Sequence, residues 1–146
     1  MKVIHYTESV FKLRPIIIKN GNGRTGILAK PQGGLWCSPL NSKYGWKDWC
    51  KENDFGNVDQ MQEIILNVDM INFVVINSIK DMETKLPWYK MDNLFDAIDF
   101  ENLVRQGFDG VYLTIKGEGK TRYSSPHGLY GWDCETILIL NERCIK

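Results

Sequence analysis

Two carboxylates stand at the entrance of an apolar segment near the C-terminus of the chain. Asp133 and Glu135 precede the run from Thr136 to Leu140, whose β-branched composition is typical of a buried strand. A carboxylate that such a strand holds at the rim of a pocket can stabilise positive charge in a transition state. The alternative is that Glu135 is an ordinary solvated charge at a strand end.

Further candidate side chains are polar or aromatic and lie in two earlier segments. Taken singly, each has a structural explanation, because strand histidines are usually hydrogen-bonded structural residues and tryptophans at helical spacing usually belong to a core. Their combination with a later glutamate is more informative. They are His5, Tyr6 and Thr7 in the first segment and Trp36, Ser38, Trp46 and Trp49 in the second.

The elements that would position these residues are short. The pattern predicts helices at Tyr44–Asn53 and Phe100–Gln106, the second capped by Asp99 and ended by Gly107. Leu13–Ile18 is an apolar run that fits either a strand or the end of a helical turn. Glycine-rich loops are expected at 20–26 and 116–131, and Pro87 marks a break. Strands are expected at Lys2–Tyr6, Gly33–Pro39, Glu63–Val68, Asn72–Ser78, Val111–Ile115 and Thr136–Leu140.

The order of these elements lacks a regular strand–helix alternation, which favours an α+β fold over a doubly wound one. A chain of 146 residues fits one domain over 1–146. The 18 basic residues balance the 18 acidic ones, so the net charge gives no field for steering to nucleic acid. The N-terminus turns polar before a signal peptide could form, and no segment suits a bilayer span, so a cytoplasmic protein with no membrane partner is expected.

The four cysteines lack the spacing of a metal site, and we expect them to be buried, unreactive thiols. They are Cys37, Cys50, Cys134 and Cys144.

Three blocks of the chain resemble, in order, the ADP-ribosyltransferase superfamily, in the branch whose signature is a His, an aromatic residue and a Glu. The second block is similar to that of the poly(ADP-ribose) polymerases, and Gly107–Tyr112 resembles the strand entry of small members. Lys30-Pro31 and the tryptophans after it also resemble small phage and bacterial proteins, for which the host cytoplasm would be the location. The three blocks are Val3–Thr7, then Gly34–Pro39 with Ser42-Lys43 and Asp48-Trp49-Cys50, then Glu135–Asn141.

The resemblance implies a single ADP-ribosyltransferase-like domain of short, mainly antiparallel strands in two packed sheets with a few helices. It also implies that NAD is the substrate and that no metal is needed. The nicotinamide–ribose bond would break and ADP-ribose would pass to a macromolecular acceptor. A protein is the expected acceptor and nucleic acid stays open. With water as acceptor, the protein would be an NAD glycohydrolase.

The resemblance also assigns roles to residues. Glu135 would stabilise the cation on the ribose, as in glycoside hydrolysis. His5 would bind the adenosine-side ribose with help from Thr7. The remaining NAD-binding positions would be the backbone of Tyr6, the cleft residues Trp36 and Ser38, and Trp49 or Trp46 stacked on nicotinamide.

Two departures from the family pattern affect these roles. Tyr6 stands where the family has a glycine whose backbone approaches nicotinamide. Trp49 takes the place of the stacking tyrosine, and a tryptophan cannot donate a phenolic hydrogen bond. The acceptor would be recognised by Asp133, Arg122 and Tyr123, although solvated loop charges explain these residues as well.

Two other functions stay open. Cys134 with His127 as base and Asp133 as orienter would make a thiol hydrolase, although nucleophile and base usually come from separate segments. A non-catalytic interaction or inhibitor protein on the same fold would use none of this chemistry.

Overall fold

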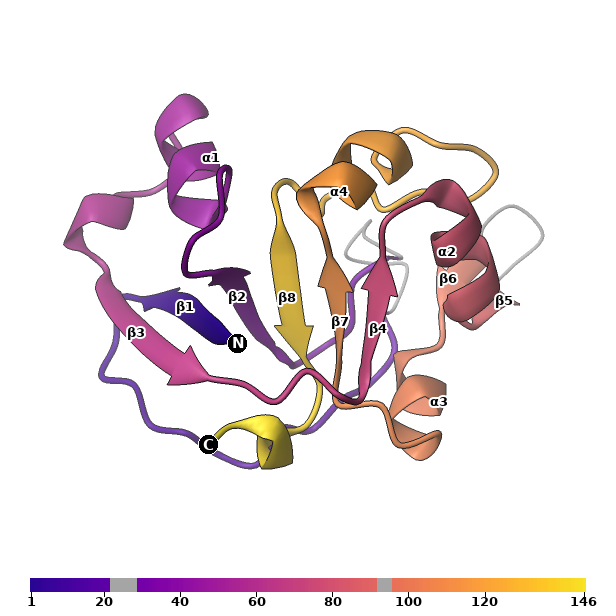
Figure 1. The fold of residues 1–146 in the computed structure, drawn as a ribbon, viewed down its shortest axis with the longest axis horizontal. Helices are drawn as coiled ribbons and strands as arrows, with labels where there is room; N and C mark the ends of the chain where they lie inside the picture. The colour runs from indigo at the N-terminus through magenta and orange to yellow at the C-terminus, as the bar shows by residue number, and fades with distance from the viewer. Residues whose placement is uncertain (22–28, 92–95) are drawn as a thin grey trace.

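The structure is a computed structural model that describes residues 1–21, 29–91 and 96–146. Within these ranges the chain forms a six-stranded sheet of order β3-β1-β2-β8-β7-β4, a two-stranded sheet and four short α-helices (Figure 1). In the large sheet only β4 and β7 pair in parallel. The strands of the large sheet are β1 (Lys2–Thr7), β2 (Leu35–Pro39), β3 (Gln62–Asn67), β4 (Phe73–Ile76), β7 (Gly110–Leu113) and β8 (Thr136–Ile139).

The predicted class, α+β with short, mainly antiparallel strands and a few helices, is confirmed. In Figure 1, β8, β7 and β4 run side by side, whereas β1 and β3 cross the view obliquely, so the sheet is strongly twisted. The two-stranded sheet is the antiparallel pair β5 (Trp88–Lys90) and β6 (Asp96–Ile98).

Two of the helices lie where the sequence predicts them, α1 (Trp46–Glu52) and α3 (Phe100–Arg105). Asp99 caps α3 by accepting a hydrogen bond from the backbone N–H of Asn102 at 2.9 Å. Gly107 follows with φ +91°, a conformation that glycine adopts at little cost.

The two faces of the large sheet carry separate apolar clusters. One contains Leu138, Phe100 and Trp132 among its buried residues, with α2 (Ile79–Lys85) contributing Met82. The other contains Val3, Cys37, Phe73, Ile137, Ile139 and Cys144. Because β8 supplies buried side chains to both faces, it is the centre of the core.

The predicted glycine-rich loop over 116–131 is wrong in its first part, where α4 (Ile115–Thr121) forms. The Thr114 hydroxyl caps this helix by accepting from the backbone N–H of Gly117 at 3.1 Å. A Cβ at Gly117 would lie 2.1 Å from the carbonyl oxygen of Ile76. This glycine therefore lets α4 pack closely against the end of β4, and it does not mark a loop.

The prediction for Leu13–Ile18 is also wrong, because these residues form neither strand nor helix. Pro15 offers no N–H to a ladder, and the N–H of Ile16 donates to the Glu142 carboxylate at 2.8 Å. The break placed at Pro87 overlooked α2 before it and β5 and β6 after it. Most of the loop predicted over 20–26 lies outside the described residues.

Over the described ranges, no helix is both long and apolar enough to cross a bilayer.

Candidate functional site

A cavity of about 320 Å³ opens where β1 and β2 part. These strands pair at only two positions, Val3 with Pro39 and Ile4 with Ser38. Beyond them the Nδ1 atom of His5 lies 2.9 Å from the carbonyl oxygen of Trp36 and bridges the two strands. The cavity is lined by Ile4, His5, Tyr6, Lys30, Trp36, Cys37, Ser38, Trp46, Gly131, Asp133, Cys134 and Thr136.

Two tryptophans supply the aromatic walls. Trp36 meets Trp132 edge to face, with ring centroids 5.0 Å apart, and the indole N–H of Trp132 donates to the carbonyl oxygen of Ala29 at 2.7 Å. Trp46 stacks on Trp49 at 5.1 Å and 16°. Both walls are therefore braced from behind by a second indole, as a rigid binding surface requires.

Ser38 fixes the position of Trp46 relative to β2. Its hydroxyl accepts a hydrogen bond from the backbone N–H of Trp46 at 2.9 Å, at the start of α1. A Cβ at Gly45 would lie 3.0 Å from the Cβ of Ser38, so the glycine allows the helix to start close to the strand. The aromatic wall on α1 is thus attached to the floor of the cavity.

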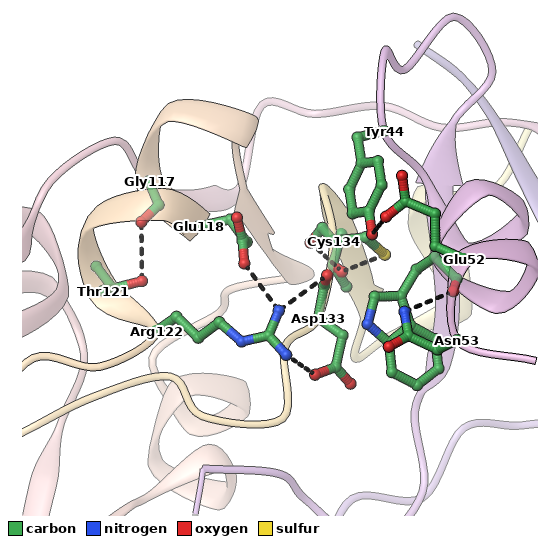
Figure 2. A network of polar contacts seen from close by, with 11 residues as sticks. Tyr44, Glu52, Asn53, Gly117, Glu118, Thr121, Arg122, Asp133 and Cys134 are labelled. Carbon is green, nitrogen blue, oxygen red and sulfur yellow. Dashed lines mark hydrogen bonds and ion pairs between the residues drawn. The ribbon is translucent and has the colours of Figure 1, made fainter. Parts of the chain in front are cut away.

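Asp133 is the acidic side chain that lines the cavity, and it is paired. One guanidinium nitrogen of Arg122 lies 2.9 Å from its carboxylate, and another lies 3.2 Å from that of Glu118 on α4. Figure 2 shows the guanidinium between the two acids. Arg122 therefore compensates the charge at this end of the cavity.

Glu135 is buried, with 8% of its surface exposed, and does not line the cavity. The Ser42 hydroxyl donates to one carboxylate oxygen and the Tyr112 hydroxyl to the other, both at 2.6 Å. Burial first, and then the bond to Glu135, raise the pKa of Tyr112. The neighbours Cys134 and Thr136 face the cavity, whereas Glu135 is directed to hydroxyl partners beside the second apolar cluster.

The cavity thus brings together six of the residues that the family resemblance assigned to NAD or the acceptor, His5, Tyr6, Trp36, Ser38, Trp46 and Asp133, and also Cys134 of the thiol-hydrolase hypothesis. The others lie outside its lining. Thr7 contacts Ser9, and Trp49 stands behind Trp46. Tyr123 is 79% exposed, with the guanidinium of Arg122 over its ring.

The structure does not favour the hypothesis of a thiol hydrolase that uses Cys134 and His127. Burial raises the pKa of the Cys134 thiol to about 11, which opposes formation of the nucleophilic thiolate. The Nε2 atom of His127 instead lies 2.7 Å from the Asp96 carboxylate, and its ring stacks on Trp88 at 4.3 Å. His127 is therefore engaged by the two-stranded sheet.

Sequence reasoning missed Lys30, whose ammonium lies 5.1 Å from the ring centroid of Trp36. Ser42 and Tyr112 lay within the segments that resemble the family, but the sequence assigned neither of them a role in the site. No local pattern marks Ser42 and Tyr112, because their partner Glu135 lies 93 and 23 positions away in the sequence. Among the described residues, no group of three or more His, Cys, Asp or Glu side chains is arranged to hold a metal ion.

Comparison with known proteins adds no family. No protein-family model, no curated protein and no solved structure matches this chain.

Proposed function

We propose that this protein binds NAD in the cavity between β1 and β2 and transfers ADP-ribose to a macromolecular acceptor, on an ADP-ribosyltransferase-like fold. One observation carries the proposal. Residues assigned to NAD because of the family resemblance come from β1, β2 and α1, and they line one cavity: His5, Tyr6, Trp36, Ser38 and Trp46.

The chemistry of the lining suits the nicotinamide end of NAD. A pyridinium ring is flat and cationic, and indole faces attract such cations. A cavity of about 320 Å³ is at the lower end of the range for small-molecule sites. Nicotinamide and its ribose would occupy it, and the adenosine half would lie along the exposed rim beyond His5.

In the proposed reaction the nicotinamide–ribose bond breaks and neutral nicotinamide leaves with the electron pair. The ribose carries the positive charge until the acceptor nucleophile adds and loses its proton. Glu135 is the proposed stabilising carboxylate. Each of its oxygens accepts one hydroxyl hydrogen bond and keeps a lone pair for the 2′-hydroxyl of the ribose. The Glu135 side chain does not line the cavity, so contact with the ribose requires the carboxylate to turn toward the cavity when NAD binds.

A specific observation favours a second candidate, a non-catalytic interaction or inhibitor protein on the same fold. Glu135 is held by two hydroxyl groups and Asp133 by Arg122. If both carboxylates keep these partners when NAD is bound, the protein binds the dinucleotide without cleaving it.

Incubation with NAD labelled in its adenosine half, together with a cell lysate, tests the proposal. The label should enter protein, and free nicotinamide should appear in step with it. Glu135→Gln should abolish both, while the control Glu83→Gln, a change on the exposed face of α2, should leave them intact. Labelling that survives Glu135→Gln would overturn the assigned mechanism. NAD affinity without nicotinamide release would favour the binder, and release without labelling would favour NAD glycohydrolase activity.

A further inference from the structure

Lys30 places a positive charge on the wall of the cavity. Its ammonium lies 5.1 Å from the ring centroid of Trp36, and its side chain is part of the lining. An ammonium over an indole face is attracted to the ring, but this attraction is weaker than that of a direct ion pair. Lys30 is half-buried, and this burial lowers the pKa of its ammonium.

The acidic group that acts on this ammonium has another partner. Asp133 attracts the Lys30 ammonium electrostatically, but its carboxylate makes an ion pair with Arg122 at 2.9 Å. Within the described residues, no carboxylate forms an ion pair with Lys30. A charge in a half-enclosed cavity that lacks a direct counter-ion favours an anionic ligand, because the ligand restores the lost solvation.

The cavity has a cationic end and an aromatic end. Trp36 and Ser38 are two residues apart on β2, so their side chains lie on one face, about 7 Å apart along the strand. Lys30 lies over Trp36, whereas Ser38 bonds the backbone of Trp46. A cationic pyridinium would avoid the Lys30 end and stack at the Trp46 end.

From this polarity we infer that Lys30 binds a phosphate group of the nucleotide and thereby sets the direction in which NAD enters the cavity. This inference rests on the proposed function. The nicotinamide ring lies against Trp46, the ribose near Ser38, and the adjoining phosphate at Lys30. The phosphate meets a point charge that can donate hydrogen bonds, which is the usual role of a lysine in phosphate binding.

Calorimetric titration with three ligands tests the inference: nicotinamide riboside, which has no phosphate, nicotinamide mononucleotide, which has one, and NAD, which has a pyrophosphate joined to adenosine. Lys30→Met keeps the length of the side chain and removes its charge. It should weaken binding of the mononucleotide and of NAD by about tenfold or more, and that of the riboside by less than about twofold. Lys30→Arg should retain the phosphate contact. Equal losses for riboside and mononucleotide, or no loss for either, would overturn the inference.

Lys43→Met is the matched control, because Lys43 is exposed on the segment before α1 and should leave all affinities unchanged. Circular dichroism should show that Lys30→Met is folded, and Lys30→Arg gives a second comparison if it is not. ADP separates this inference from the proposed function. Binding of ADP that depends on Lys30, without NAD cleavage, would sustain the phosphate site and reject the transferase. NAD cleavage by Lys30→Met with an unchanged KM would sustain the transferase and reject the phosphate site.

Discussion

The Nδ1 atom of His5 lies 2.9 Å from the carbonyl oxygen of Trp36, so a side chain joins β1 to β2 where their backbone pairing ends. A carbonyl oxygen only accepts hydrogen bonds, so Nδ1 carries the proton and Nε2 is the acceptor in the neutral ring. His5 therefore positions the Trp36 wall of the cavity in addition to lining it.

Replacing His5 with alanine should lower the free energy of unfolding by about 1 kcal/mol, the usual contribution of one hydrogen bond. Affinity for NAD should fall in the same variant, because the wall at Trp36 loses its link to β1. Urea denaturation measures the first effect and calorimetry the second. Thr7→Ala on the same strand is the control, since its hydroxyl contacts Ser9 at the surface. Equal stability of the two variants would contradict the bridging role.

The pair Glu135 and Tyr112 should be strongly coupled. Tyr112→Phe and Glu135→Gln should each cost about 1–3 kcal/mol of unfolding free energy, because each disturbs a hydrogen bond to a buried carboxylate. The double variant should lose less than the sum of the two. A double-mutant cycle by urea denaturation gives the coupling energy directly.

A matched control for this cycle is present in the same molecule. The Tyr44 hydroxyl donates to the Glu52 carboxylate at the same 2.6 Å, but at the exposed surface (Figure 2). Tyr44→Phe with Glu52→Gln should show coupling below about 1 kcal/mol, because solvent competes for both groups. Similar coupling in the two cycles would show that burial does not strengthen the Glu135 contact.

Alkaline pH should destabilise the fold. Burial raises the pKa of the Cys134 thiol and of the Cys144 thiol to about 11, from an ordinary value of 9.0. Between pH 9 and pH 11 the unfolded chain loses these protons while the folded chain keeps them, so the free energy of unfolding falls as pH rises. Each thiol contributes a slope of up to about 1.4 kcal/mol per pH unit. Urea denaturation at pH 8, 9 and 10 should show the decline, and Cys144→Ala should make it shallower.

The native thiols should react slowly with iodoacetamide at pH 7.5. All four cysteines are buried, and reaction requires an exposed thiolate. Unfolding in urea should make all four react, and Glu83→Cys should supply a fast native thiol for comparison. Mass spectrometry of the labelled chain identifies the sites. Rapid native labelling of Cys134 would revive the thiol-hydrolase hypothesis.

The elements that the sequence could predict are those whose signals are local. The β-branched run at β8 and the Asp99 cap with Gly107 at α3 need no distant information. Helix α4 could not be predicted, because its glycines signal a loop until Ile76 is seen against Gly117.

The site divides in the same way. The order of the blocks that resemble the family grouped residues of β1 and β2 in one site, and these residues line one cavity. The environment of Glu135 could not be foreseen, because its partners Tyr112 and Ser42 lie 23 and 93 positions away. Alternation along the chain separates Glu135 from Cys134 and Thr136, but which side faces the cavity and which partners lie on the other depend on contacts distant in sequence.

The short pairing between β1 and β2 has a mechanical consequence. β1 pairs with β3 at six positions but with β2 at only two, supplemented by the N–H of Leu40 donating to the carbonyl of Lys2. Local opening should therefore begin at this seam and release β1 and β3 together. A ligand in contact with both Tyr6 and Trp36 spans the seam, so occupancy of the cavity would also fasten one half of the sheet to the other.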